Sequence, residues 1–133
     1  MHTTRLPTAA GCTLHTAGQD WDAVRVPRSV GLAAMEILGA RCGAVVEDSL
    51  SSAVYFFTPV GTSAAWTAEN TRALGAGSAV TIPPARRTEG PGVYWRMCPG
   101  ENGWLTDPRA LEAALGDAFG PRVGAQREAG AEA

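Results

Sequence analysis

The sequence predicts an α+β fold, a single small domain with a mixed, mostly antiparallel sheet of about five or six strands and two main helices. Short segments rich in β-branched and aromatic residues alternate with turn residues, and two stretches carry apolar residues at helical spacing. A chain of 133 residues has the length of one ordinary domain. We expect residues 21–120 to form this domain, between a loose lead (1–20) and a flexible tail (121–133).

The first strand and the first helix are expected directly after the lead. Residues 22–26 (DAVRV) alternate polar and apolar side chains up to Pro27, which is typical of a short strand. Ser29 is a suitable N-cap for a helix that runs to about Ala40. The apolar face of this helix is predicted to consist of Val30, Ala34, Ile37 and Leu38.

The middle of the chain predicts a hairpin and two further strands. Residues 43–47 and 53–58 flank the polar turn DSLSS and are expected to pair. Residues 59–70 contain Pro, Gly, Ser and Thr and are predicted to connect this hairpin to the strands at 72–74 and 78–82.

The last elements surround a loop with two arginines. Residues 77–95, GSAVTIPPARRTEGPGVYW, predict a strand, a loop rich in Gly and Pro, and a return strand at 92–97. The final helix is predicted to begin with Asp107 as its N-cap and Pro108 as its first residue, and to end at Gly120. Its apolar face consists of Leu111, Leu115 and Phe119.

Composition excludes several classes of function. All 11 basic residues are arginine, so no Schiff-base lysine and no P-loop is possible. The net charge of −2 argues against binding to nucleic acid that is dominated by electrostatic attraction. No segment has the length of a signal peptide core or a membrane span, and the odd number of cysteines suits a reducing compartment. We therefore expect a cytoplasmic protein without a membrane partner.

The cysteines and histidines allow a zinc site only in principle. Cys12 and His15 form one closely spaced pair, and Cys42 or Cys98 would have to supply the remaining ligands. Structural zinc sites usually have two such pairs, so unrelated cysteines are the favoured interpretation. No metal and no cofactor is expected.

Three segments resemble a known family. These are VTIPPARRTEGPGVYW (80–95), AVYFFTP (53–59) and DAVRVP (22–27), the last followed by a helix. Together they resemble the N-terminal domain of bacterial bifunctional DNA primase/polymerases, the prim-pol branch of the archaeo-eukaryotic primase superfamily, over roughly residues 21–118. In that family a strand ends in a proline motif, passes through a polar loop, and returns through a strand with Tyr and Trp.

The catalytic positions implied by this resemblance are not filled by catalytic residues. The family's Asp-x-Asp metal ligands fall on Arg25 and Pro27, which cannot bind Mg²⁺, and Asp22 lies too early on the strand. The phosphate-contacting histidine of the family falls at about Ala53. The resemblance therefore implies a relative without catalytic activity.

Two groups of residues are explained by the fold without a ligand. Glu47 and Asp48 are adjacent on a strand and point to opposite faces, so we expect a solvated turn instead of a cation site. The four tryptophans are expected mainly in the core. For Tyr94 and Trp95, alternation predicts that one side chain faces the core and the other faces solvent or a helix.

The candidate ligand-binding residues are Arg86 and Arg87 in the loop, with Arg96, Tyr94 and Trp95 on the return strand. Guanidinium groups bind phosphate or carboxylate in a bidentate manner. Solvated loop charges, in which an arginine pairs with Glu89, are the alternative interpretation.

Two classes of function remain. The first is a non-catalytic binding or regulatory domain that acts through a protein partner or through weak contact with nucleic acid or a nucleotide at the arginine loop. The second is a small enzyme that binds an anionic substrate beside Arg86 and Arg87, with a carboxylate of Asp22, Glu36 or Glu47 as its acid or base. A free sheet edge would allow a homodimer in either case.

Overall fold

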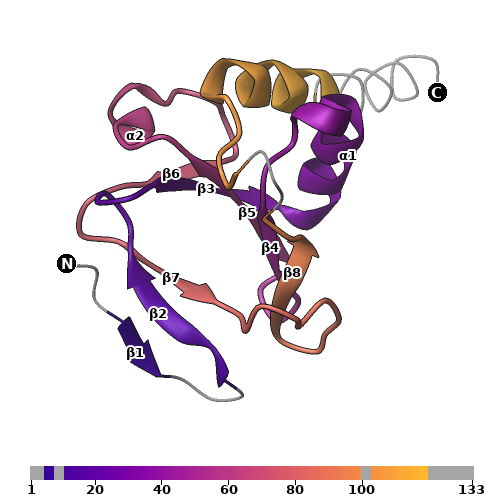
Figure 1. Cartoon of the computed structure of the whole chain (residues 1–133). Coiled ribbons are helices and arrows are strands. Elements are labelled where there is room, and N and C mark those ends of the chain that lie inside the picture. The colour runs from indigo at the N-terminus through magenta and orange to yellow at the C-terminus, as the bar shows by residue number, and fades with distance from the viewer. Residues whose placement is uncertain (1–4, 8–10, 100–102, 120–133) are drawn as a thin grey trace.

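The computed structural model describes residues 5–7, 11–99 and 103–119 (Figure 1). The predicted tail at 121–133 and the predicted helix end at Gly120 lie outside these residues. The elements, in order, are β1 (Arg5–Pro7), β2 (Thr13–Thr16), β3 (Asp22–Pro27), α1 (Arg28–Leu38), a 3-10 turn (Gly39–Arg41), β4 (Val45–Asp48), β5 (Ala53–Thr58), α2 (Thr62–Ala65), β6 (Arg72–Leu74), β7 (Ala79–Ile82) and β8 (Val93–Met97). A C-terminal helix follows over residues 108–119.

The larger sheet has five strands in the order β6-β3-β5-β4-β8. The α+β prediction is confirmed. The sheet was predicted to be mixed and mostly antiparallel, and every neighbouring pair in it is antiparallel. Short connections such as the turn between β4 and β5 explain this pattern, because parallel neighbours need long crossovers.

A second sheet contains three antiparallel strands in the order β1-β2-β7. The sequence predicts loop for residues 1–20, and this is wrong for β1 and β2. The signal is weak because β2 (TLHT) is only four residues long and contains a single apolar residue, Leu14. Its regular structure comes from pairing with β7, in which Leu14 lies opposite Thr81 and Thr16 lies opposite Ala79.

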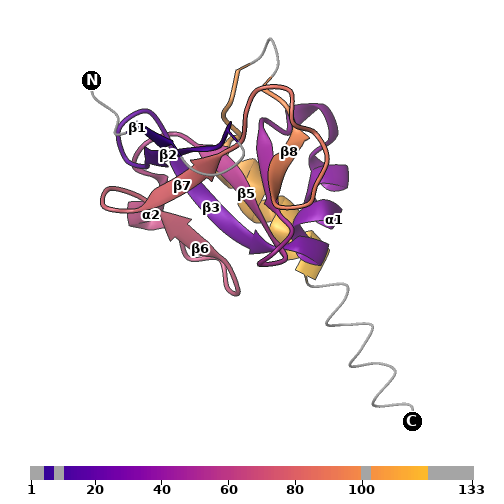
Figure 2. The same ribbon diagram turned by 90° about the horizontal axis from the view of Figure 1, so that it is seen from below.

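The molecule has three layers. α1 and the C-terminal helix cover one face of the five-stranded sheet, and the three-stranded sheet lies on the opposite side (Figures 1 and 2). Alternation along the strands supplies one apolar cluster to each face. Phe56 of β5 points to the helices and Phe57 points to the smaller sheet, and both are fully buried.

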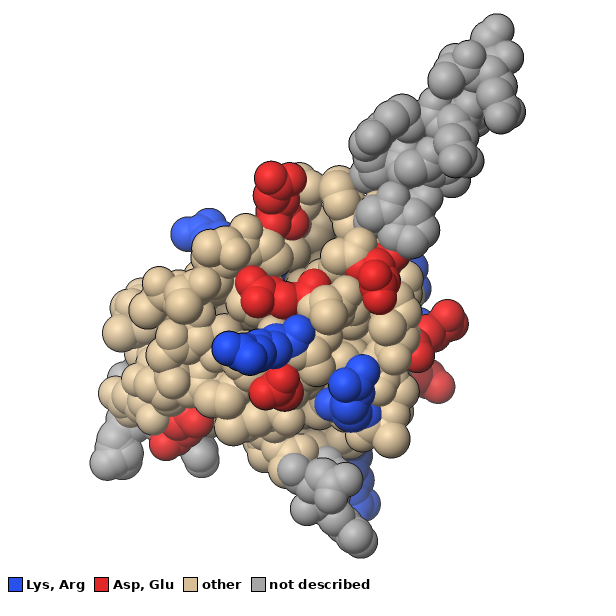
Figure 3. Space-filling model, turned by 90° about the horizontal axis from the view of Figure 1, so that it is seen from above, with Lys and Arg blue, Asp and Glu red and all other residues tan. Residues whose placement is uncertain are grey.

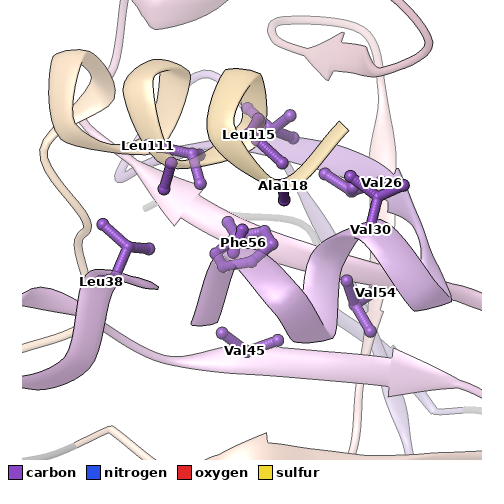
Figure 4. Close-up of a cluster of buried hydrophobic side chains, with 12 residues drawn as sticks. Val26, Val30, Leu38, Val45, Val54, Phe56, Leu111, Leu115 and Ala118 are labelled. Carbon is purple, nitrogen blue, oxygen red and sulfur yellow. The ribbon is translucent and has the colours of Figure 1, made fainter. Parts of the chain in front are cut away.

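The cluster under the helices is aliphatic apart from Phe56 (Figure 4). Leu111, Leu115 and Ala118 of the C-terminal helix meet Val30, Ala34 and Leu38 of α1 over the sheet. The cluster on the other face is aromatic. Phe57 makes edge contacts with Trp21 and Trp104, with ring centroids 4.9 Å and 5.4 Å apart.

Both main helices form as predicted, but only one has the predicted cap. Asp107 caps the C-terminal helix, since its Oδ2 accepts the N–H of Ala110 at 3.0 Å. By contrast, α1 begins at Arg28 after Pro27, and no side chain caps it. The predicted Ser29 cap is therefore wrong, because Pro27 ends β3 and φ there already suits entry into a helix. Ile37, predicted on the apolar face, is 43% exposed.

The strand–loop–strand segment does not form a hairpin. β7 belongs to the three-stranded sheet and β8 to the edge of the five-stranded one. The loop between them joins the two sheets. No helix of the described residues has both the length and the apolar character required to cross a membrane.

Candidate functional site

The arginine loop, residues 83–92, is held against β8 by Trp95. The indole Nε1 of Trp95 donates to the carbonyl of Pro84 at 3.1 Å, and its backbone N–H donates to the carbonyl of Arg87 at 2.8 Å. The N–H of Arg87 also donates to Pro84, at 3.0 Å. Trp95 is itself buried in the aromatic cluster, so the base of the loop is anchored in the core.

The loop curves around an open concavity of about 670 Å³. Arg86 is exposed and Arg87 is half-buried. The concavity is lined by Arg86, Arg87, Thr88, Glu89, Gly90 and Pro91. Two guanidinium groups and one carboxylate on its wall leave a net positive charge, which suits an anion.

A buried carboxylate lies beside this loop. Glu47 was predicted to lie in a solvated turn, and this is wrong, because its side chain is only 2% exposed. The register explains its burial. Glu47 lies opposite Val54 of β5 and Tyr94 of β8, on the face that α1 covers.

Glu47 holds two arginines that are far apart in the sequence. Its Oε2 accepts a hydrogen bond from Nε of Arg28 at 2.6 Å, and its Oε1 lies 3.5 Å from Nε of Arg96. The second contact is an ion pair and not a hydrogen bond, since Oε1 has no hydrogen-bond partner. We call Arg28, Glu47, Tyr94 and Arg96 the Glu47 network.

A β-bulge interrupts the pairing of β8 with β4 at Arg96. Val46 lies opposite Trp95, whereas its neighbour Val45 lies opposite Met97. Arg96 is therefore the extra residue on β8, and bulges of this kind redirect a side chain. Alternation along β8 puts Tyr94 and Arg96 on the face of Glu47 and Trp95 on the other face, and the bulge leaves Arg96 without a residue of β4 directly opposite it.

Two groups of the network have raised pKa values. The hydrogen bond to Glu47 and the negative charge of Glu47 raise the pKa of Arg28, so its guanidinium stays charged. Burial raises the pKa of Tyr94, and the Glu47 carboxylate raises it further. The Tyr94 hydroxyl therefore remains protonated at neutral pH.

The two guanidinium groups keep donors for a ligand. Each uses Nε toward Glu47, and a guanidinium has five N–H donors in all. Among the residues that the structure describes, neither side chain has another ion pair or hydrogen bond. The side chains of Arg28 and Arg96 are 46% and 37% exposed, so their terminal amino groups are accessible from solvent.

The loop and the Glu47 network are in contact. A Cβ placed on Gly90 would lie 3.2 Å from the ring of Tyr94, so the loop backbone rests on that ring. Ser49 ties the same loop to the end of β4, since its Oγ accepts the N–H of Gly92 at 2.8 Å. The arginine loop and the network therefore form one edge of the molecule.

The structure assigns different positions to the five predicted ligand-binding residues. Arg86 and Arg87 lie on the loop, and Arg96 reaches the surface beside it. Tyr94 and Trp95 are both buried, so neither ring offers a stacking surface. Both instead contact the arginine loop from the side of the core.

Two residues of the site were not predicted to bind a ligand. Arg28 and Glu47 are 19 residues apart in the sequence, and the pairing of β5 with both β3 and β4 brings them together. The run VVED does contain the signal for burial of Glu47, because Glu47 shares a face with Val45.

The suggested zinc ligands are not assembled in the described ranges. No group of three or more His, Cys, Asp or Glu side chains is placed there to hold a metal ion. Cys12 is buried, and Nε2 of His15 lies 2.9 Å from Oγ1 of Thr13.

Comparison with protein-family models, with curated proteins and with solved structures yields no match to this chain.

Proposed function

We propose that this protein is a non-catalytic binding domain that holds a phosphate-bearing ligand, a nucleotide or nucleic acid, at the edge formed by the arginine loop and the Glu47 network. The observation that carries the proposal is the attachment of two half-exposed arginines, Arg28 and Arg96, to one buried carboxylate. Such a pair offers several N–H donors at a fixed position.

Preorganisation is the physical basis of this proposal. A free arginine side chain loses rotamer freedom when it binds a ligand. Glu47 has already fixed Arg28 and Arg96 through Nε, so less entropy remains to be lost. Phosphate matches the fork of a guanidinium group and forms short, charge-assisted hydrogen bonds with it.

The charge distribution supports a local contact instead of a broad electrostatic surface. On the helix-covered face, acidic and basic side chains are interspersed (Figure 3). The chain as a whole carries a net charge of −2. We therefore expect modest affinity with a small number of phosphate contacts and a shallow salt dependence.

The resemblance to prim-pol domains is consistent with such a role and remains a hypothesis. Arg25 and Pro27 occupy the positions of the prim-pol metal ligands, and the nearby Asp22 forms structural hydrogen bonds. Its Oδ2 accepts N–H groups of Gly61 and Ser63 at 3.0 Å and 2.9 Å. In this view the domain would retain binding without catalysis.

The cellular location belongs to the same proposal. Cys12, Cys42 and Cys98 are all free thiols, which suits a reducing cytoplasm.

The test is a titration monitored by fluorescence anisotropy. The ligands are labelled single-stranded DNA, duplex DNA of equal length, and ATP with Mg²⁺, each at low and physiological salt. We compare the wild type with an Arg28→Gln/Arg96→Gln variant and an Arg86→Ala/Arg87→Ala variant. The control is Arg109→Gln, which removes an exposed charge from the C-terminal helix.

We expect each double variant to weaken binding by about tenfold or more, as the loss of charge-assisted hydrogen bonds implies, and the control to bind like the wild type. If the wild type binds none of the three ligands at low salt, the proposal is wrong. A protein partner, or a second copy paired through a sheet edge, would then be sought.

A further inference from the structure

We propose a second anion site on the opposite face of the five-stranded sheet, in which Arg25 and Arg72 bind one phosphate group beside the ring of Tyr55. This inference does not depend on the proposed function, because it concerns other residues on another face.

The strand register places these three side chains in one row. Arg25 of β3 lies opposite Arg72 of β6 on one side and opposite Tyr55 of β5 on the other. Side chains of directly opposed residues lie on the same face of a sheet, with Cβ atoms about 4.5–5.5 Å apart. The row therefore holds two guanidinium groups and one aromatic ring side by side.

The row lies on the face that the three-stranded sheet covers only in part. Ala23 and Leu74, one step along the same strands, are buried in the aromatic cluster. Arg25 and Tyr55 are half-buried, and Arg72 is exposed. Seen from the side of the smaller sheet, β1, β2 and β7 overlap the beginning of β3 and leave its carboxyl-terminal end in view (Figure 2).

The opposition of two arginines requires an explanation. Like charges directly opposite each other destabilise a sheet, and either position would accommodate a neutral side chain. Among the described residues, the side chains of Arg25 and Arg72 have no ion pair and no hydrogen bond. The nearest acidic residue on this face by register is Asp48, two strands away from β3, and its Oδ1 accepts the N–H of Leu50 instead.

A phosphate group fits this arrangement better than a carboxylate. Two guanidinium groups provide two positive charges, and a phosphate monoester carries close to two negative charges at neutral pH. Each guanidinium binds phosphate through a pair of parallel N–H donors. The ring of Tyr55, next in the row, is then placed beside whatever carries the phosphate, and aromatic rings stack on bases.

The experiment measures thermal unfolding at constant ionic strength, with sodium phosphate replacing sodium chloride. In the wild type, phosphate should raise the Tm, because binding to the folded state stabilises it. We test Arg25→Gln and Arg72→Gln, with Arg41→Gln, an exposed residue after α1, as the control. The same variants are then titrated with ATP in the absence of Mg²⁺ and with oligothymidylate, to distinguish a free nucleotide from a polynucleotide.

Both Gln variants should show a smaller rise in Tm with phosphate than the wild type, because only the site of the Glu47 network remains intact in them. Without phosphate, each should have a Tm about 1–3 °C above the wild type, because the like-charge repulsion is gone. This second readout shows that the variants fold. An equal effect of phosphate on the wild type and both variants would overturn the proposal, as would its absence in the wild type.

The Arg28→Gln/Arg96→Gln variant separates this site from the proposed function. If the phosphate effect on Tm persists in that variant and is smaller in Arg25→Gln than in the wild type, the second site stands by itself. If it disappears in the first and persists in the second, phosphate binds only at the Glu47 network and the second site is refuted.

Discussion

At the scale of single residues, Glu47 decides what the candidate site can do. It is a buried carboxyl side chain, among mostly apolar neighbours, on the face of the sheet that α1 and the C-terminal helix cover. A buried charge is tolerated only with partners, and its partners, Arg28 and Arg96, come from the surface. The cost of burying one carboxylate is thus offset by contacts that also fix two surface cations.

We expect Glu47→Gln to lower the free energy of unfolding by about 1–3 kcal/mol. This decrease is smaller than the one expected when one partner of a fully buried ion pair is removed. Arg28 and Arg96 are half-exposed, so water can hydrate their guanidinium groups in the variant. Urea denaturation measures the change. Glu36→Gln is the matched control, because Glu36 is exposed on α1 and should change stability very little; equal effects at both positions would contradict the role assigned to Glu47.

Tyr94 makes stability sensitive to high pH. Burial and the Glu47 carboxylate raise the pKa of Tyr94 above its ordinary value of 10.0. As pH rises past 10, the tyrosine ionises in the unfolded chain before it ionises in the folded one. Its contribution is therefore complete below pH 10 and is lost as pH rises through the folded pKa.

The expected result is an unfolding free energy that falls more steeply above pH 10 in the wild type than in Tyr94→Phe. Denaturation at a series of pH values between 8 and 11 measures this slope. Tyr55→Phe serves as the control for removal of a tyrosine. If all three proteins show the same slope, Tyr94 is not the group responsible.

At the scale of elements, close approach between α1 and the sheet depends on a glycine. Gly31 is buried in α1, and a Cβ at this position would collide with Cγ2 of Val54 on β5. Glycine usually lowers helix stability, so its presence here reflects contact with the sheet. The helix lies as near to β5 as its backbone allows.

We expect Gly31→Ala to destabilise the protein by about 1–3 kcal/mol through overpacking, despite the better helix propensity of alanine. Gly116→Ala tests the same substitution in the C-terminal helix, where a Cβ meets no atom within 4 Å. That variant should be more stable by about 0.5–1 kcal/mol. A destabilised Gly31→Ala and a stabilised Gly116→Ala would confirm that Gly31 is required for close contact between α1 and β5. Stabilisation of both variants would refute this.

How well each element can be predicted from the sequence depends on where its stabilisation arises. AVYFFT (53–58) and the Asp107–Pro108 helix start carry their own local signals, and both form as predicted. TLHT (13–16) carries only a weak local signal, because its strand depends on pairing with β7, which lies more than 60 residues along the chain. The two arginines of the loop are visible in the sequence, whereas Glu47 and Arg28 become partners only through strand pairing.

At the scale of the whole molecule, the central strands of the five-stranded sheet contribute to both cores, and β5 supplies a phenylalanine to each. Phe56 packs under the helices and Phe57 packs against Trp21, Trp95 and Trp104 on the other face. The arginine loop connects β7 of one sheet to β8 of the other. The candidate site therefore depends on the fixed placement of both sheets.

We accordingly expect the two sheets to unfold together. Tryptophan fluorescence reports mainly the aromatic cluster, while circular dichroism at 222 nm reports the helices on the opposite face. The two urea denaturation curves should coincide, as in a two-state transition. Phe57→Leu should shift both curves equally, with a loss of about 1–2 kcal/mol. A fluorescence transition that precedes the loss of helix would show that the three-stranded sheet separates first, and the arginine loop would then lose its anchor before the Glu47 network is lost.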